Sequence, residues 1–140
     1  MPWTATNDSL ANNFSGTASY TTEFKLEGPL AQDYLLQLGA VCESARVWIN
    51  GSLAGTAWSI PFRLKVGKYL RKGKNTIRIE VANLMANRIR FMDRNGLSWK
   101  NYHEINFVNI DYKNFDASGW DVQPSGLKGP VTLQPLKVLY

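Results

Sequence analysis

The sequence predicts an all-β domain, a sandwich of two packed sheets with about eight short strands. Three observations support this prediction. Apolar side chains recur at every second position in successive short runs, which is the period of a strand with one buried face. Turn-forming pairs such as Asn50-Gly51 and Gly28-Pro29 separate these runs. No stretch shows a helical period of any length, and the sequence contains no internal repeat.

The first predicted strands follow a loose N-terminal segment. Residues 1–14 are rich in Asn, Thr, Ser and Ala without a clear period, and we expect one turn of helix at Asp8 to Asn12. A strand is predicted from Gly16 to Gly28-Pro29, where the glycine and proline end it. The next run, Asp33 to Leu38, is apolar on both faces, which indicates a central or covered strand.

A hairpin in the middle of the chain is the clearest local feature. Residues 46–49 alternate and then turn at Asn50-Gly51, a pair that tolerates the positive φ values of a tight turn. Residues 52–56 are expected to return antiparallel to the first run. Residues 60–66 alternate again, and residues 75–84 form a longer predicted strand. The side chains expected on the buried faces of these two runs are Phe62, Leu64, Val66, Ile77, Ile79 and Val81.

The pattern changes after residue 84. Residues 88–92 alternate briefly with the period of a strand. Residues 93–122 are predicted to be a long loop insertion, rich in aromatic and amide side chains, with one or two short strands or helical turns. Residues 131–140 form the predicted closing strand. Its alternation shifts phase near Pro135, which indicates a bulge or an edge position.

Residues 1–140 are expected to form a single domain. At 140 residues, folding buries roughly two-thirds of the unfolded surface, which is enough for an ordinary core. The hydrophobic content of 44% suits a folded globule.

Cys42 is the one cysteine, so no internal disulfide forms, and its apolar surroundings predict a buried, inert thiol. No apolar run approaches the length of a membrane span, so we expect no membrane contact.

The net charge of +5 comes from 16 basic and 11 acidic residues, and seven of the basic residues lie between Arg63 and Arg78. One interpretation is a binding face, residues 63–78, for an anionic polysaccharide or another polyanion. The other is a solvated outer sheet face, because Arg63, Lys65 and Arg78 alternate with apolar residues. Tyr69 is the one aromatic residue of this run that could stack on a base, so we expect no nucleic acid partner.

Several short motifs occur in an order that resembles a known family. The motifs are residues 16–20, 47–51, 72–75, 79–83 and 124–133, with Phe24, Gly55 and Pro61-Phe62 between them. In this order they resemble the "sugar-binding" β-sandwich domain of glycoside hydrolase family 2 and its relatives, a galactose-binding-like jelly roll. The middle section, residues 87–120, is similar to the C-terminal sandwich of the large family 106 α-L-rhamnosidases.

The resemblance implies a non-catalytic accessory domain of a glycoside hydrolase, of the bacterial rhamnosidase or β-glycosidase type. In such enzymes the catalytic carboxylates lie on a separate barrel domain, which would be the partner of this domain. The longer protein is then expected to be periplasmic or secreted. Residues 1–4 lack the charged start and apolar core of a signal peptide, so we expect an excised domain with an added start methionine.

Catalysis by the chain itself would need two carboxylates facing each other across a scissile glycosidic bond. The candidates in the insertion are Glu104, Asp111, Asp116 and Asp121, and none stands in a sequence context that marks a buried acid. His103 and Glu104 are adjacent, so on a strand they would face opposite ways. We therefore predict no catalytic residue in this chain.

Metal and cofactor binding find little support in the sequence. One cysteine and one histidine exclude a normal structural zinc site. Asp111, Asn114, Asp116 and Asp121 could supply oxygen ligands for calcium, although an EF-hand loop is absent. The family resemblance leaves room for a structural calcium, without a set of ligands. We expect no other cofactor and name no metal-binding residue.

Sugar binding needs an aromatic face beneath the sugar and planar polar groups for its hydroxyls. The insertion offers both, and Trp58, in the loop before Pro61, could join the same end of the domain. The alternative is that these aromatic residues cap the sandwich or pack on a neighbouring domain. The predicted carbohydrate-binding residues are Trp58, Trp99, Asn101, Tyr102, His103, Trp120 and Asp121.

Overall fold

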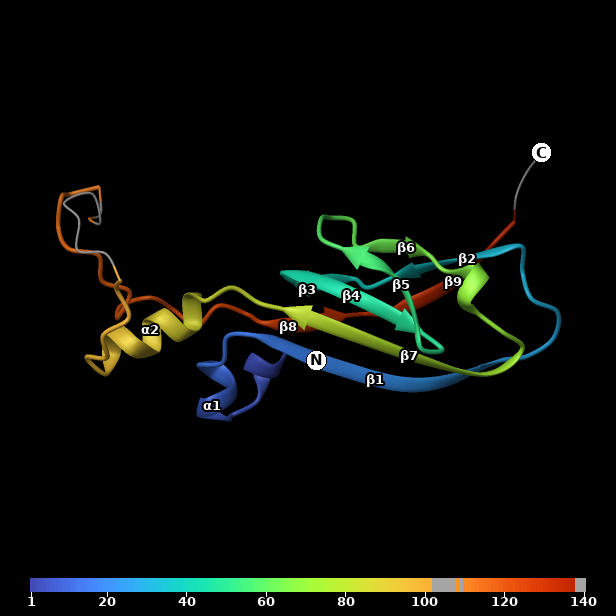
Figure 1. Ribbon diagram of the computed structural model, residues 1–140, viewed down its shortest axis with the longest axis horizontal. Helices are drawn as coiled ribbons and strands as arrows, with labels where there is room; N and C mark the ends of the chain where they lie inside the picture. Colours follow the sequence, from blue (N-terminus) through green and yellow to red (C-terminus); the bar gives the residue numbers. More distant parts are fainter. Residues whose placement is uncertain (102–107, 109, 138–140) are drawn as a thin grey trace.

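The computed structural model describes residues 1–101, 108 and 110–137, and it confirms the all-β sandwich (Figure 1). The described residues contain nine strands, against about eight predicted. These are β1 (Thr17–Leu26), β2 (Asp33–Gln37), β3 (Ala40–Cys42), β4 (Ser44–Ile49), β5 (Ser52–Ala57), β6 (Arg63–Lys65), β7 (Gly73–Ala82), β8 (Gly126–Gly129) and β9 (Thr132–Leu136). The helical elements are η1 (Trp3–Ala5), α1 (Ser9–Asn12), η2 (Gly67–Tyr69) and α2 (Ala86–Arg94).

Two antiparallel sheets form the layers of the sandwich. The first has the strand order β1-β7-β4-β5, and the second has the order β6-β2-β9. A short β3–β8 ladder lies at the end of the sandwich that is nearer α2 (Figure 1). β2 is the central strand of its sheet, as predicted for a run that is apolar on both faces, and β9 is an edge strand, as its Pro135 requires.

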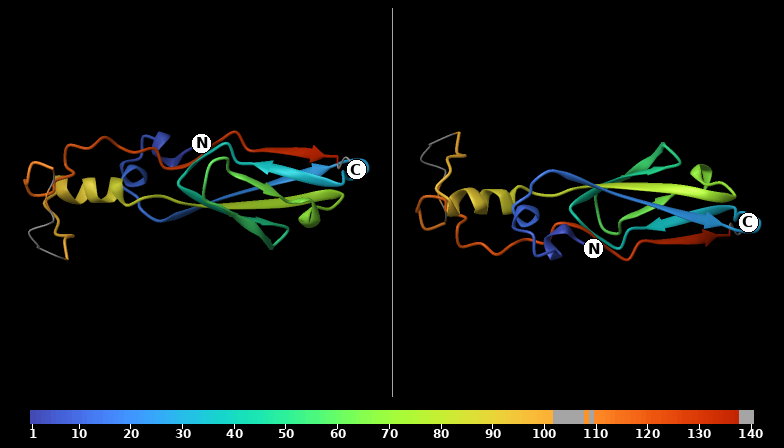
Figure 2. Two further views of the ribbon diagram at one scale, coloured as in Figure 1. Left: turned by 90° about the horizontal axis from the view of Figure 1, so that it is seen from above. Right: turned by 90° about the horizontal axis from the view of Figure 1, so that it is seen from below.

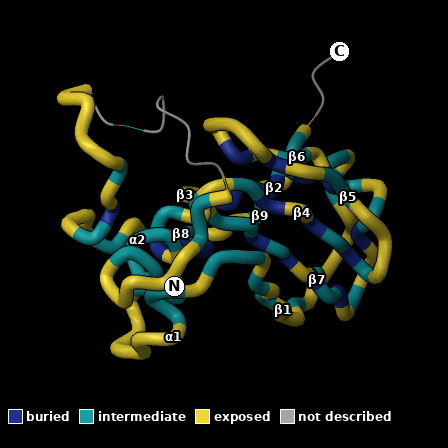
Figure 3. Tube along the Cα trace, turned by 60° about the vertical axis from the view of Figure 1, so that its left-hand side comes forward, coloured by how far each residue is buried: buried dark blue, intermediate teal, exposed yellow. Residues whose placement is uncertain are grey.

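The core lies between the sheets and follows the predicted two-residue alternation. On β7, Ile77, Ile79 and Val81 are buried while Arg78 is exposed. Figure 3 shows the buried positions concentrated in the strands. Each fully buried aliphatic side chain stabilises the fold by about 1.5–3 kcal/mol. The largest fully buried apolar side chains are Leu38, Val47, Ile49, Val66 and Val81.

The predicted hairpin is confirmed in its details. Ile49 pairs with Ser52, so the loop between β4 and β5 consists of Asn50 and Gly51 alone. Their φ values are 52° and 86°, the left-handed conformation that a tight hairpin turn needs at both positions. A register shift between Val47 and Trp48 marks a bulge in the same hairpin.

A buried asparagine network holds the start of β7 against this hairpin. Asn75 is completely buried; its amide donates to the carbonyl oxygens of Arg71 at 2.7 Å and Gly73 at 3.0 Å. Its carbonyl oxygen accepts from Arg71 N at 3.0 Å and from the Asn50 amide at 2.8 Å. Asn50 also donates to Tyr69 O and accepts from Thr76 N. Backbone groups of the turn before β7 are thereby satisfied by side chains.

The helical turn predicted at Asp8 to Asn12 is confirmed as α1. Asp8 caps this helix, since its carboxylate accepts a hydrogen bond from Leu10 N at 2.8 Å. Residues before it are tied to the sandwich: Trp3 N donates to Ser125 O at 3.1 Å, and the Tyr20 hydroxyl donates to Met1 O at 3.3 Å.

The strand-like alternation at residues 88–92 was misleading, because this segment forms helix α2. Over five residues, alternation does not distinguish a strand from one face of a helix. Here Ile89 N donates to Met85 O at 2.9 Å, the hydrogen bond of a helical turn.

No helix in the described part of the chain is long and apolar enough to cross a membrane.

Replacing Asn75 should destabilise the fold strongly. Asn75→Ala empties a buried position, removes four hydrogen bonds and takes from the backbone groups of Arg71 and Gly73 their Asn75 partners. We expect a loss of about 2–4 kcal/mol in the free energy of unfolding, measured by urea denaturation. Asn7→Ala, the same change at an exposed position, is the control and should cost less than about 0.5 kcal/mol. Equal losses in the two variants would contradict this account.

Candidate functional site

Between β7 and β8 the chain leaves the sandwich and forms an arm, residues 83–125, that contains α2. All the views in Figures 1 and 2 show α2 beyond one end of the sandwich, along the long axis of the molecule. Much of the arm that the structure describes is exposed (Figure 3). Most of the predicted sugar-binding residues belong to this arm.

Polar side chains hold the two ends of the arm together. Asn87 is buried; its amide donates to Gln123 O at 2.8 Å, and its carbonyl oxygen accepts from Gln123 N at 2.7 Å. The amides of Asn83 and Asn87 both donate to the hydroxyl oxygen of buried Ser125, at 3.0 and 3.3 Å. Asn83 also accepts from Gly16 N at 2.9 Å. The base of the arm is therefore fixed to Gly16 and Ser125, the residues directly before β1 and β8.

Further out, α2 holds the returning chain through its charged side chains. The Asp93 carboxylate accepts from the Trp99 indole N–H at 2.6 Å and from Ala117 N at 2.8 Å. Arg90 Nε donates to Trp120 O, and Arg94 Nε donates to Ser118 O, each at 2.6 Å. Charge-assisted hydrogen bonds of this length are stronger than neutral ones, so they fix the arm without a large apolar core.

An aromatic cluster, Trp99, Phe115 and Trp120, forms the packed part of the arm. The Phe115 ring meets Trp99 edge-on at 5.8 Å and Trp120 edge-on at 5.5 Å between ring centroids. The Lys100 ammonium donates to Phe115 O at 2.6 Å and lies 5.6 Å from the Trp99 ring centroid. Trp120 remains 40% exposed, so part of its ring is open to a ligand or a neighbouring surface.

The structure brings together part of the predicted sugar-binding set. Trp99 and Trp120 meet through Phe115, and Asn101 and Asp121 are exposed on the same arm. Tyr102 and His103 lie outside the described residues. Trp58 is 76% exposed in the loop between β5 and β6, which lies on the sandwich and away from α2 in Figures 1 and 2. We find no described contact that joins Trp58 to the aromatic cluster.

Sequence reasoning missed Phe115 and Asp93 as the residues that organise the arm. Both residues lie in the segment predicted to be a loop insertion, in which apolar residues do not recur at regular positions, so the sequence does not indicate which residues make contact. It also missed an exposed groove of about 610 Å³ between α1 and α2. The four-residue spacing of Leu10 and Phe14 was the available signal for this groove. The groove is lined by Leu10, Asn13, Phe14, Ser15, Met85, Arg88 and Phe91.

The acidic side chains of the arm serve local structure. Asp116 accepts hydrogen bonds from Ser118 N at 2.8 Å and from the Ser118 hydroxyl at 3.0 Å. These bonds, the backbone one first, lower the pKa of Asp116 from its ordinary value of 3.8. Within the described residues, no three side chains of the His, Cys, Asp and Glu types gather where they could hold a metal ion.

Cys42 is half-buried rather than fully buried, and it lines a groove of about 150 Å³ at the base of the arm. Burial and, to a smaller extent, the Glu43 carboxylate raise the pKa of the thiol, while Lys128 opposes them. A raised pKa keeps the thiol protonated at neutral pH, which agrees with the predicted inert character.

The basic run at residues 63–78 is divided between the two sheets. Arg63 and Lys65 belong to β6, whereas Lys74 and Arg78 belong to β7. Lys74 pairs with Glu23 at 2.9 Å, and Arg78 pairs with Glu80 at 3.4 Å while covering the Trp48 ring at 4.3 Å. The charges are thus partly compensated and do not form one continuous strip, so binding of a polyanion along this run is not favoured.

Replacing Asp93 should loosen the arm and leave the sandwich intact. Asp93→Ala removes the acceptor of both the Trp99 indole and the Ala117 amide. We expect hydrogen exchange at the Ala117 amide to become roughly tenfold to a hundredfold faster, with little change at β7. Asp121→Ala, which removes an exposed carboxylate of the same arm, is the control. Unchanged exchange at Ala117 would contradict the anchoring role.

Replacing Ser118 should shift the titration of Asp116. Ser118→Ala removes the hydroxyl donor but keeps the backbone N–H, so the pKa of Asp116 should rise toward 3.8 without reaching it. A lowered folded-state pKa stabilises the fold above the ordinary pKa, and this contribution disappears as the pH falls through the lowered value. An NMR titration of the Asp116 carboxyl carbon measures the shift. Identical titrations in both proteins would refute this assignment.

Comparisons with known proteins agree with the geometry. Residues 2–130 match the family model described as glycosyl hydrolase 2 galactose-binding domain-like. The solved structure of a rhamnosidase from Novosphingobium sp. PP1Y is 34% identical and superposes with a TM-score of 0.73, over 94% of this chain and 12% of that chain. An FMN-binding β-glucuronidase from Faecalibacterium prausnitzii L2-6 shares the fold, with a TM-score of 0.52 at 20% identity, over 94% of this chain and 18% of that one.

A Formosa agariphila protein assigned as a β-glucuronidase is 38% identical over 90 residues, which is 62% of this chain and 8% of that protein. The chain therefore spans only a small part of the length of the relatives that it matches. Because the family model covers nearly the whole chain and the observed sandwich agrees with it, the chain belongs to the galactose-binding domain-like family of glycosyl hydrolase 2.

Proposed function

We propose that this chain is a non-catalytic accessory domain, which supports the catalytic domain of a longer glycoside hydrolase polypeptide. The observation that carries the proposal is the arm: it projects beyond the sandwich, yet a dense set of hydrogen bonds fixes its course. A rigid projection can set the position of a neighbouring domain, whereas a loose loop cannot. The small share of each relative that this chain covers agrees with such a modular role.

The arrangement of the carboxylates supports the non-catalytic role. Asp93, Asp116 and Glu80 each accept hydrogen bonds or ion pairs from neighbouring groups of the domain. The grooves lined by Cys42 and by Leu10 contain at most one carboxylate residue each. A glycosidase site needs two carboxyl groups about 5–9 Å apart that face one substrate. Neither the groove lined by Cys42 nor the groove lined by Leu10 offers such a pair of carboxyl groups.

We also propose that the arm contacts glycan through the open part of the Trp120 ring. The Trp120 ring packs edge-on against Phe115, and the Trp120 carbonyl oxygen accepts a hydrogen bond from Arg90. These two contacts fix the orientation of the exposed part of the ring. Asp121 follows Trp120 in the sequence and is exposed, so its carboxylate is open to solvent and available to accept hydrogen bonds from sugar hydroxyl groups. A fixed aromatic surface beside a polar group suits the C–H face and hydroxyl groups of a sugar.

The longer polypeptide is proposed to act in the periplasm or outside the cell, where large glycans are degraded. This placement rests on the expected substrate alone. Fractionation of the source cells, with detection of the intact polypeptide, would test it, and recovery in the cytoplasm would contradict it.

Glycan contact predicts a selective loss on mutation. In titrations of the chain with rhamnose- and galactose-containing oligosaccharides, Trp120→Ala should weaken binding by about tenfold, since losing an aromatic contact worth about 1.4 kcal/mol lowers an affinity tenfold. Trp58→Ala is the matched control, because it removes an exposed Trp from a different loop and should leave binding unchanged.

The same preparations should not cleave chromogenic glycosides. Hydrolysis by the purified chain would refute the accessory role. Equal binding by both Trp variants, or no binding of any glycan by the wild-type chain, would refute the glycan contact. The accessory role would then still be judged by whether the purified chain hydrolyses glycosides.

A further inference from the structure

Two Asn-Gly pairs occur in the sequence, Asn50-Gly51 and Asn95-Gly96. In such a pair the backbone nitrogen of the glycine can attack the carbonyl carbon of the asparagine side chain, because glycine has no Cβ to hinder the approach. A bond forms between this nitrogen and Cγ, and Nδ2 leaves as ammonia with the proton that the glycine nitrogen gives up. Water then opens the resulting succinimide ring to aspartate or isoaspartate. The two pairs share this chemistry, but their structural settings differ.

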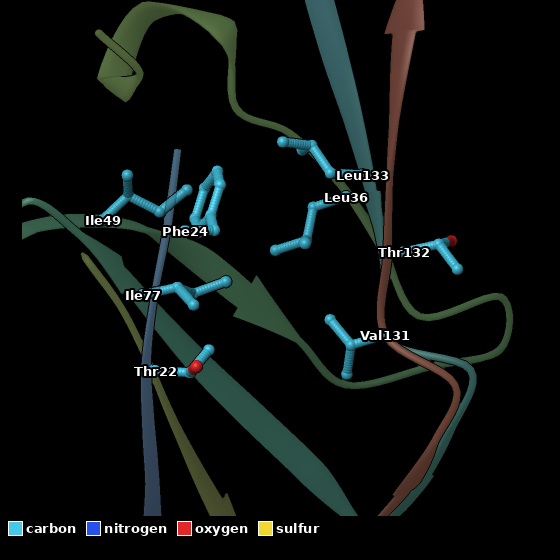
Figure 4. Close-up of a pocket in the computed structure, with 8 residues that line it drawn as sticks. All are labelled: Thr22, Phe24, Leu36, Ile49, Ile77, Val131, Thr132 and Leu133. Carbon is cyan, nitrogen blue, oxygen red and sulfur yellow. The ribbon is translucent and has the colours of Figure 1, made fainter. Parts of the chain in front are cut away.

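The Asn50 side chain is held by three hydrogen bonds. Its Nδ2 donates to Tyr69 O at 2.9 Å and to Asn75 Oδ1 at 2.8 Å, and its Oδ1 accepts from Thr76 N at 3.0 Å. The residue before it, Ile49, is 1% exposed, and Figure 4 shows the Ile49 side chain pointing toward the opposite sheet. Attack on the Asn50 side chain therefore requires this network at the start of β7 to open.

Asn95 lies at the exposed C-terminal end of α2. In the described part of the chain, its side chain makes a single hydrogen bond, from Nδ2 to Phe91 O at 2.8 Å. Gly96 ends the helix with a φ of 63°, and its backbone nitrogen donates to Asp93 O at 3.3 Å, which is long for a hydrogen bond. Helix ends open locally at low cost in free energy, so the Gly96 nitrogen reaches Asn95 Cγ without unfolding of the sandwich.

Either product at position 95 changes the end of α2. The side chain loses the Nδ2 donor to Phe91 O and gains a negative charge beside the last carbonyl groups of the helix, where the helix dipole is already negative. Isoaspartate also adds one carbon to the main chain. The last turn of α2 carries Asp93 and Arg94, whose side chains hold the returning part of the arm. A change at position 95 therefore acts on the contacts that fix the arm.

We propose that Asn95 is a site of spontaneous deamidation in the folded protein, and that its conversion to aspartate or isoaspartate loosens the arm. Asn50 belongs to the same dipeptide but is protected by its hydrogen bonds at the start of β7. Water is the one co-reactant, so the modification proceeds without an enzyme. The reaction is a property of the two turns and does not depend on the accessory role of the domain.

Peptide mass spectrometry of the folded chain, sampled during incubation at mildly alkaline pH, tests the site. Deamidation should be at least about tenfold faster at Asn95 than at Asn50, because one hydrogen bond rather than three must break to free the side chain. In the chain unfolded in urea the two rates should become similar. Equal rates in the folded chain, a faster reaction at Asn50, or a difference that persists in urea would overturn the proposal.

Hydrogen exchange tests the consequence for the arm. Asn95→Asp reproduces one of the two products, and it should make exchange at the Ala117 amide roughly threefold to tenfold faster while the β7 amides keep their rates. Asn7→Asp, the same change at an exposed position outside the arm, is the matched control and should leave Ala117 unchanged. Wild-type exchange at Ala117 in Asn95→Asp, or an equal acceleration in Asn7→Asp, would refute the loosening of the arm.

Discussion

The hydrogen-bonding capacity of the backbone where β7 begins and ends is the constraint on which the rest of the structure depends. This strand lies inside the larger sheet, between β1 and β4. Asparagine side chains bind backbone groups near both ends. Asn50 and Asn75 bind those of residues 69, 71, 73 and 76 at the start, and Asn83 and Asn87 bind those of residues 14, 16 and 123 after the end. An amide side chain is suited to this task because it donates and accepts at once.

The arm depends on the same chemistry on a larger scale. Of the apolar side chains of the arm that the structure describes, Ala117 alone is fully buried, and charge-assisted hydrogen bonds from α2 hold the returning chain. Such hydrogen bonds fix the backbone without the additional apolar side chains that hydrophobic packing would need and would leave partly exposed to water. A projecting element can therefore be ordered while its outer surface stays available for glycan or for another domain.

The sandwich was predictable from the sequence because burial on one face imposes a two-residue period on each strand. The turn at Asn50-Gly51 and the pattern of β7 show this directly, since both depend on local geometry. The arm was not predictable in the same way. Asp93 and Phe115 act on residues between 5 and 24 positions away with no period to reveal them, as the contacts from Asp93 to Ala117 and from Phe115 to Trp120 show.

Both guanidinium groups of α2 that hold the returning chain bind main-chain carbonyl oxygens, those of Ser118 and Trp120. A main-chain acceptor is present whichever amino acid occupies the position. The path of the chain is thus separated from the chemistry that it displays, and the displayed side chains are free to diverge without loss of shape. The shape of the arm can therefore be inherited within the family while the surface that it displays changes.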